Sequence, residues 1–243
     1  MISRETEELL RRLLAEQPTY KPTRAVLEQL KHITMLSFVG ASSMGKTTIM
    51  ELLAKNGAGY GITKNFTSRP PRAEDTPNRY VYFEHSDAGL KPILDRITSH
   101  ELLQYNIHPF SLHVYGSEIE GYPHKYNMGD IFYSSIDGFR QLGFQELHVF
   151  SVITEPAMWL ARFDERFPSD SPQRQARLAE AISSLEWSLS QTATAHTWII
   201  DRDGECEMAA ADIRRVISGQ TIKQVEARKL ADECLAVIQG LRS

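Results

Sequence analysis

Hydrophobic and polar positions along the chain follow a helical period in some stretches and form continuous apolar runs in others. Apolar residues at helical spacing predict helices over residues 3–16 and 23–31, with prolines between them. The apolar run 33–39 then predicts a buried strand, and a helical pattern covers 47–55. The polar turn 67–72 separates this part from the rest of the chain. The first third of the chain is therefore expected to consist of helices and one buried strand.

The remainder alternates between strand and helix patterns. An alternating stretch predicts a strand at 79–84, and apolar, β-branched runs predict buried strands at 130–136 and 146–153, with a short strand at 197–200. The helices expected around these strands begin at 87 and span 155–163, 174–191, 205–218 and 221–241. Strands that alternate with helices predict an α/β fold, a three-layer doubly wound parallel sheet that binds its ligand at the carboxyl ends of the strands.

Residues 40–48 read Gly-Ala-Ser-Ser-Met-Gly-Lys-Thr-Thr, a G-x-x-x-x-G-K-T motif between an expected strand and an expected helix. Its glycines let successive backbone N–H groups point into one concavity, where they and the helix dipole hold an anion. Lys46 is expected to reach the β- and γ-phosphates of ATP, and the Thr47 hydroxyl to ligate Mg²⁺. The predicted nucleotide-binding residues of this P-loop are Gly40, Ser42, Ser43, Gly45, Lys46, Thr47 and Thr48.

Composition narrows the class of protein. The 243 residues suit one sizeable α/β domain, or a domain with appendages. The formal net charge of −4 does not indicate the excess of positive charge that is typical of nucleic-acid-binding proteins. The two cysteines have no C-x-x-C spacing, and the N-terminus is charged and amphipathic rather than a signal peptide. No apolar run is long enough to cross a bilayer. A reduced, cytoplasmic chain that binds neither nucleic acid nor membrane is expected.

Two sets of arginines suggest a reaction. Arg69 and Arg72 lie in a proline-containing loop, where two guanidinium groups are expected to converge on one phosphate. Arg162, Arg166 and Arg177 flank a polar, proline-containing segment, as expected of groups that clamp a transferring phosphoryl group when water is excluded. Taken singly, each arginine is also explained by a solvated surface or a surface salt bridge.

From about residue 33 to 203 these motifs resemble guanylate kinase and its relatives, the P-loop nucleoside monophosphate kinases. Residues 67–72, Thr-Ser-Arg-Pro-Pro-Arg, resemble the acceptor loop of that family, and Tyr80 falls where its phosphate-binding tyrosine follows. Residues 115–117, Tyr-Gly-Ser, are similar to its Tyr-Gly-Thr/Ser motif. The spacing of Arg162, Arg166 and Arg177 matches its lid arginines, and Asp201 ends a sequence similar to its turn near the adenine.

The resemblance implies a role for each of these residues. Lys46, Arg162, Arg166 and Arg177 would be catalytic, Asp201 would join the ATP site, and no covalent intermediate is needed. The residues expected at the acceptor are Asn65, Arg69, Arg72, Tyr80, Gln104, Tyr115, Ser117 and Ser135. The expected organisation is an N-terminal helical extension at 1–32, a P-loop domain at 33–218 with an acceptor lobe at about 65–127 and a lid at about 164–174, and a C-terminal helical extension at 219–243.

The departures from the family concern the base. Gln104 and Ser135 stand where the family reads guanine with carboxylates, and Tyr133 replaces another acid of the same strand, although a shifted register would bring in Asp130 or Asp137. A carboxylate accepts two hydrogen bonds from guanine, whereas Gln presents a donor to a donor. The expected function is ATP-dependent phosphoryl transfer to a small phosphorylated acceptor, most simply a nucleoside monophosphate other than GMP.

Two other functions stay open. Kinases that form ribose 1,5-bisphosphate resemble guanylate kinases and lose the strand carboxylate, although they generally lack the Arg-x-Pro-Arg loop. Guanylate-kinase-like modules of scaffold proteins bind peptides without catalysis, but they typically lose the P-loop lysine or the lid arginines, which this chain retains. The helical extensions leave room for a homodimer interface.

Overall fold

The computed structural model describes residues 2–57, 59–71, 75, 79–192 and 196–242. The chain divides into two compact units, which alternate along the sequence. The first unit consists of Met1–Ile33, Ile62–Asn127 and Leu142–Gln145, and the second of Thr34–Gly61, Met128–Gln141 and Glu146–Ser243. Across the described ranges, none of the helices combines the length and apolar character that a membrane crossing needs.

A five-stranded sheet runs through the second unit in the order β2-β7-β1-β8-β9. Its strands are β2 (Tyr60–Ile62), β7 (Tyr126–Asp130), β1 (Thr34–Val39), β8 (Glu146–Ile153) and β9 (Thr197–Ile200). β1 pairs with β8 in parallel, from Thr34 opposite Glu146 to Val39 opposite Ser151, and β8 pairs in parallel with β9. Every residue of β1 is buried, as the continuous apolar run predicts for a central parallel strand.

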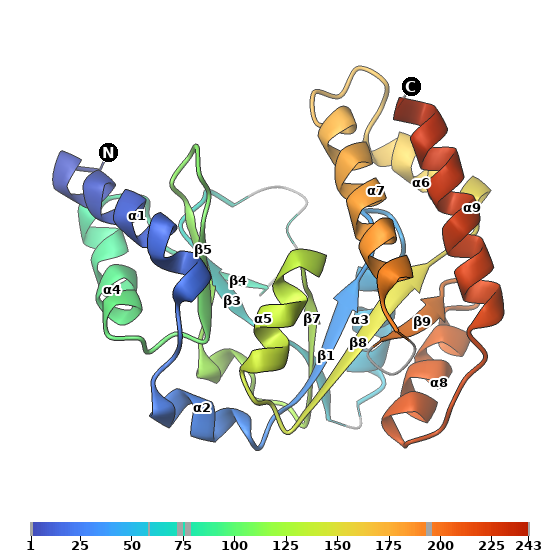
Figure 1. Cartoon of the computed structure of the whole chain (residues 1–243), viewed down its shortest axis with the longest axis horizontal. Helices are drawn as coiled ribbons and strands as arrows, with labels where there is room; N and C mark the ends of the chain where they lie inside the picture. The colour runs from blue at the N-terminus through green and yellow to red at the C-terminus, as the bar shows by residue number, and fades with distance from the viewer. Residues whose placement is uncertain (1, 58, 72–74, 76–78, 193–195, 243) are drawn as a thin grey trace. The chain divides into compact units, whose positions relative to one another are not determined.

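The helices of the second unit connect these strands or, in the case of the last two, follow β9. They are α3 (Lys46–Lys55), α5 (Ile136–Gln141), α6 (Pro156–Arg166), α7 (Arg174–Ser190), α8 (Cys206–Ile217) and α9 (Val225–Arg242), with a 3₁₀ turn η3 (Tyr133–Ser135) before α5. α3 packs with α8, and α7 packs with α9, which lies beside it in Figure 1. This is the doubly wound α/β architecture that the sequence predicts. The chain passes from β1 to β2 and β7 on one side of β1 and then enters β8 on its other side, so the strand order reverses at β1. The carboxyl end of a strand at such a reversal is the place where these folds bind ligands.

One predicted strand is wrong. The apolar run 130–136 was expected to form it, but the strand is β7, which ends at Asp130, and Tyr133–Ser135 form the 3₁₀ turn. Ile136 is buried at the start of α5 together with Phe139, three residues on, so the apolar spacing there is that of a helix face. The sheet instead contains the buried residues Asn-Met-Gly at 127–129. These residues lack β-branched side chains, so the sequence pattern did not indicate a strand there.

The first unit contains a smaller mixed sheet in the order β4-β3-β6-β5. Its strands are β3 (Asn65–Thr67), β4 (Tyr80–Tyr82), β5 (Gln104–Ile107) and β6 (Val114–Ser117). β3 pairs with β4 in parallel, and β6 pairs antiparallel with both β3 and β5. The helices of this unit are α1 (Arg4–Glu16), α2 (Arg24–Leu30) and α4 (Asp87–Thr98), with 3₁₀ turns η1 (Gln17–Thr19) and η2 (Ile119–Gly121).

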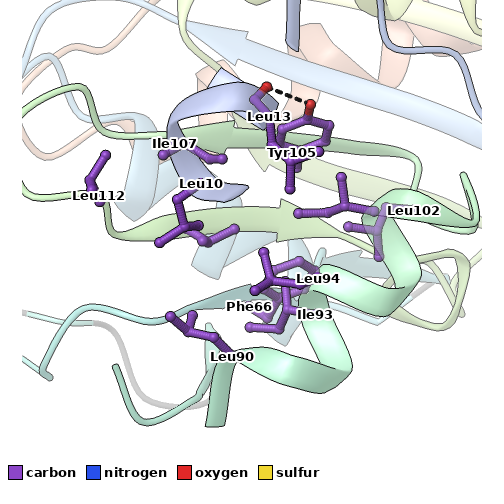
Figure 2. Packing of buried hydrophobic residues seen from close by; sticks show 12 residues of the cluster. Leu10, Leu13, Phe66, Leu90, Ile93, Leu94, Leu102, Tyr105, Ile107 and Leu112 are labelled. Carbon is purple, nitrogen blue, oxygen red and sulfur yellow. Dashed lines mark hydrogen bonds between the residues drawn. The ribbon is translucent and has the colours of Figure 1, made fainter. Parts of the chain in front are cut away.

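One face of the small sheet closes a hydrophobic core with α1 and α4. Figure 2 shows Leu10 and Leu13 of α1 packed with Phe66 and Tyr105 of the sheet and with the apolar face of α4. The Tyr105 hydroxyl donates a 2.8 Å hydrogen bond to the Leu13 carbonyl oxygen, which ties the end of α1 to β5. Burial of each such leucine is worth about 1.5–3 kcal/mol, so the N-terminal helix contributes directly to the stability of this unit.

Candidate active site

The loop between β1 and α3 has the backbone of a phosphate-binding loop. Gly40, Ser43 and Gly45 all have positive φ angles, 142°, 69° and 91°. A Cβ on Gly40 would lie 2.8 Å from the carbonyl oxygen of Val152. Gly45 directly precedes the first residue of α3, so the loop ends at a helix N-terminus, where backbone N–H groups attract an anion. The local geometry therefore agrees with the motif.

Lys46 is folded over this loop. Its side chain is nearly buried, and Nζ donates to the carbonyl oxygens of Gly40 at 2.5 Å and Ala41 at 2.9 Å. The same Nζ lies 3.8 Å from Oδ1 of Asp130, the last residue of β7. The acid of this strand that lies beside Lys46 is thus Asp130, and Tyr133 and Ser135 lie beyond the end of the strand. The sequence analysis included Asp130 only for the case of a shifted strand register, because the predicted strand began several residues too late in the chain.

The residues of the loop fit ATP and Mg²⁺. The hydroxyl of Ser43 is buried and has no hydrogen-bond partner in the part of the chain that the structure describes, as expected where a ligand supplies the missing partner. Thr47 in the first turn of α3 and Asp130 at the end of β7 offer a hydroxyl and a carboxylate, the oxygen ligands that Mg²⁺ takes in P-loop proteins. Trp159 Nε1 donates 3.0 Å to the Ser42 carbonyl oxygen and so fixes the outer part of the loop.

Asp201 lies against the same loop. It is 1% exposed, and its carboxylate is so close to Gly45 that a Cβ there would overlap it. Oδ2 of Asp201 accepts a 2.6 Å hydrogen bond from Nη1 of Arg162, and Oδ1 accepts a 3.4 Å contact from the Cys206 thiol. One predicted catalytic arginine is therefore connected to the phosphate-binding loop through one predicted nucleotide-binding carboxylate.

The other two candidate lid arginines meet at Phe167. The guanidinium carbon of Arg166 lies 5.4 Å from the ring centre and that of Arg177 lies 5.9 Å from it. Arg166 is exposed, whereas Arg177 pairs with Glu180 at 2.7 Å. The connection between α6 and α7 thus presents two positive charges around one aromatic ring.

Arg174 is a residue that sequence reasoning missed. It donates from Nη1 to the Phe167 carbonyl oxygen, pairs through Nη2 with Asp164 at 2.7 Å, and lies over the Phe163 ring. These contacts join the first residue of α7 to the end of α6, across the segment expected to be the lid. The sequence shows the arginine but not its partners, which become neighbours only when the segment folds back.

In the first unit, five of the predicted acceptor residues, Asn65, Tyr80, Gln104, Tyr115 and Ser117, lie on one face of the small sheet. The ladder places Tyr80 opposite Asn65, Asn65 opposite Ser117, and Ser117 opposite Gln104, in one row across four strands. The next row on the same face consists of Tyr82, Thr67, Tyr115 and Asn106. The opposite face carries the apolar side chains of the core. Tyr82, Thr67 and Asn106 were not selected from the sequence, although strict alternation along each short strand would have found them.

Arg69 follows this face, two residues after Thr67. It is 6% exposed, and it forms two hydrogen bonds with the Asp75 carboxylate, at 2.8 Å from Nη1 and 2.5 Å from Nη2. Hydrogen bonding to the Asp75 carboxylate raises the pKa of the Arg69 guanidinium above its ordinary value. Its expected partner at the acceptor phosphate, Arg72, lies outside the described residues.

The structure of guanylate kinase from Anaplasma phagocytophilum matches with a TM-score of 0.47 and 15% sequence identity, over 84% of this chain and 97% of that chain. No family model matches the sequence, and the comparison with curated proteins found no match.

The two positions expected to replace the base-reading carboxylates of guanylate kinase fall in different units. Gln104 begins β5 in the first unit and is partly exposed on the polar face of the small sheet. Ser135 lies in η3 of the second unit, on a 3₁₀ turn rather than on the strand that the sequence predicted. The polar face around Gln104 carries amides and hydroxyls, and neither of its two rows contains a carboxylate.

Proposed function

We propose that this chain is an ATP-dependent phosphotransferase that acts on a small phosphorylated acceptor, most simply a nucleoside monophosphate other than GMP. The observation that carries the proposal is the juxtaposition of Lys46 and Asp130, 3.8 Å apart, at a glycine loop that opens a helix. A buried lysine beside a carboxylate at the carboxyl end of a parallel sheet supplies a cation for phosphate and an oxygen ligand for a metal in one place.

The loop would bind the phosphates of ATP through its backbone N–H groups and through Lys46. In the structure the Lys46 ammonium is satisfied by two carbonyl oxygens of the loop, so a phosphate oxygen would replace neutral acceptors by a charged one. Thr47 and Asp130 would hold Mg²⁺, which when bound neutralises charge on the β- and γ-phosphates. Asp130 would keep its carboxylate beside the lysine throughout.

The three arginines would act on the group in transfer. Charge spreads over the oxygens of the transferring phosphoryl group, and positioned guanidinium groups stabilise it when water is excluded. Arg162 is already oriented by Asp201, whereas Arg166 is exposed and Arg177 pairs with a glutamate of its own helix. We therefore assign the fixed charge to Arg162 and the charges that rearrange to Arg166 and Arg177.

The small sheet of the first unit would bind the acceptor. Arg69 and the hydroxyls of Tyr80 and Tyr115 would hold its phosphate, and the neutral row from Asn65 to Gln104 would read the remainder. Amides and hydroxyls both donate and accept hydrogen bonds, which suits adenine, cytosine or uracil and also the hydroxyls of a sugar. The expected acceptor therefore carries a phosphate, and the rest of it does not need a carboxylate as a hydrogen-bond partner.

Binding of ATP tests the proposal directly. Calorimetry with Mg²⁺ and a non-hydrolysable ATP analogue should show one site in the wild-type chain and none in Lys46→Ala, since the variant loses the only side-chain cation of the loop motif. Lys55→Ala, which removes an exposed lysine from the other end of α3, is the matched control and should bind like wild type. Absence of analogue binding by the wild-type chain would overturn the proposed function.

A further inference from the structure

Arg69 is held by a carboxylate from its own loop. Asp75 lies six residues further along the chain, and its two oxygens accept hydrogen bonds from Nη1 and Nη2 at 2.8 Å and 2.5 Å. Both side chains are largely buried, at 7% and 14% exposure. Two parallel hydrogen bonds from one guanidinium are also the arrangement by which arginine binds a phosphate. Asp75 therefore uses the same pair of donors that the phosphate of an acceptor would use.

Other contacts position Arg69 independently of Asp75. Nη1 also donates 2.8 Å to the carbonyl oxygen of Pro70, and the backbone N–H of Arg69 donates to the hydroxyl of Thr67. The guanidinium carbon lies 5.2 Å from the centre of the Tyr80 ring and 5.9 Å from that of Tyr82. Aromatic faces attract a guanidinium whether or not a carboxylate is present. Loss of the Asp75 charge would thus leave a cation that is still in place.

Asp75 itself is secured by Tyr82, whose hydroxyl donates a 2.6 Å hydrogen bond to Oδ2. A buried guanidinium without a counter-charge is unfavourable, and the Asp75 carboxylate removes that cost in the absence of a ligand. A ligand that takes its place must bring at least as much negative charge. A phosphate monoester carries a charge of about −1.5 to −2 and three acceptor oxygens, whereas a carboxylate ligand carries one charge and offers no advantage over Asp75.

We propose that Asp75 is an internal competitor for the anion site at Arg69, which a phosphate monoester displaces and a carboxylate does not. The inference rests on the proposed function in taking Arg69 as the anchor of the acceptor phosphate. It adds that the affinity for the acceptor is set by an exchange of anions at Arg69. Asp75 is thereby a specificity residue: it weakens binding of every anion and removes weakly charged ones from competition.

This exchange is tested by titrating the full chain with inorganic phosphate at pH 7.5 and a fixed salt concentration and measuring the binding by calorimetry. Asp75→Asn keeps the shape of the side chain and removes its charge, so phosphate should bind at least fivefold more tightly than to wild type, and acetate should become detectable. Glu84→Gln makes the same change of net charge at an exposed position of the same unit and should leave the affinity unchanged.

Phosphate can also bind at the loop 40–48 in every one of these variants. The substitution Arg69→Ala removes the site at Arg69 and so distinguishes the two binding sites. The single variant Arg69→Ala and the double variant with Asp75→Asn should bind phosphate equally, because the site for which Asp75 competes has been removed. Tyr82→Phe keeps the ring beside Arg69 and removes the hydroxyl that secures Asp75; it should tighten phosphate binding about twofold to threefold, and it replaces Asp75→Asn if that variant does not fold.

Unchanged or weaker phosphate binding in Asp75→Asn, or in Tyr82→Phe where only that variant folds, would overturn the proposal and make Asp75 a residue that merely positions Arg69. This result is independent of the test of the proposed function. Failure to bind an ATP analogue would remove the kinase assignment while leaving the phosphate titrations to decide the role of Asp75.

Discussion

Arg162 donates a 2.6 Å hydrogen bond to Asp201, and the Asp201 carboxylate is the group that a side chain on Gly45 would meet first. An arginine of α6 is therefore positioned relative to the phosphate-binding loop by a carboxylate that follows β9. The carboxylate is 1% exposed, whereas the arginine side chain is 31% exposed, so one end of the pair is fixed and the other reaches solvent.

We expect Asp201→Asn to lower kcat at least tenfold, because the variant keeps the side-chain shape but no longer holds the Arg162 guanidinium by charge; a tenfold loss corresponds to about 1.4 kcal/mol. Asp203→Asn is the matched control. Its carboxylate is 86% exposed and lies 3.9 Å from Nη2 of Arg162, so its removal should change kcat less than twofold. Steady-state kinetics with the best acceptor would measure both, and equal effects of the two substitutions would contradict the assignment.

Gly45→Ala should abolish binding of the ATP analogue and destabilise the fold by about 2–4 kcal/mol. The new Cβ would overlap the Asp201 carboxylate, and alanine is strained at a φ of 91°. Gly57→Ala separates the two causes, because Gly57 also has a positive φ but has nothing within 4 Å of its Cβ position. Its cost should be about 1 kcal/mol, from backbone strain alone. Urea unfolding compares the two variants, and similar losses would exclude a steric role for Asp201.

GMP should be a poor acceptor, since a row of amides and hydroxyls leaves at least one guanine donor unpaired, at about 1–3 kcal/mol per buried group. A coupled assay of ADP release across the common nucleoside monophosphates and ribose phosphates measures this, and it distinguishes a nucleotide from a sugar-phosphate acceptor. Gln104→Glu should raise the relative use of GMP, whereas Asn106→Asp, which puts a carboxylate in the next row of β5, should not. GMP as the best wild-type acceptor by tenfold or more would refute this specificity.

His196 predicts a dependence of stability on pH. It is buried beside Trp198 and bonded to the Ser151 hydroxyl at 2.6 Å, and burial, with Arg140 and Arg228 nearby, lowers its pKa to about 4. The unfolded chain binds a proton at His196 near the ordinary pKa of about 6.5, so the stability from the neutral ring is complete above that pH and is lost as the pH falls to about 4. The loss is on the order of 3 kcal/mol.

Denaturant unfolding between pH 7 and 4 of wild type, His196→Gln and His32→Gln tests this dependence. Removal of His196 should flatten the decline of stability, because glutamine does not titrate. Removal of the exposed His32 should leave the decline as in wild type. Parallel curves for wild type and His196→Gln would show that another group controls stability in this range.

Three strands of the main sheet, β1, β8 and β9, and the loop 40–48 could be predicted from the sequence because their signals are local, whereas the short strand β2 was not predicted. The loop motif occupies nine consecutive residues, and β1 and β8 are continuous apolar runs. β7 could not be predicted, because its buried residues include Asn127 and Gly129, which have low strand propensity, and its place beside β1 comes from the tertiary structure. The predicted strand at 79–84 proved to be three residues long, as β4.

The candidate residues were easier to find than their partners. Arg69 and Arg162 could be selected by type and spacing, but nothing in the sequence shows that Asp75 or Asp201 neutralises them. The pairing of Arg162 with Asp201 joins positions 39 residues apart, and it requires the end of β9 to lie beside α6. Whether a charge in a motif is available to a ligand is a property of the folded chain.

The alternation of the two units along the sequence has a consequence for how the chain is made. The hydrogen bond between the Tyr105 hydroxyl and the Leu13 carbonyl oxygen spans 92 residues, and all of β1, the loop 40–48 and α3 is synthesised between its two ends. α1 therefore leaves the ribosome long before the strands that cover its leucines, and the first unit is complete only after Gln145 has been added. Each unit is built from three separate segments that alternate with those of the other, so cleavage at any one peptide bond cannot separate the two units from each other.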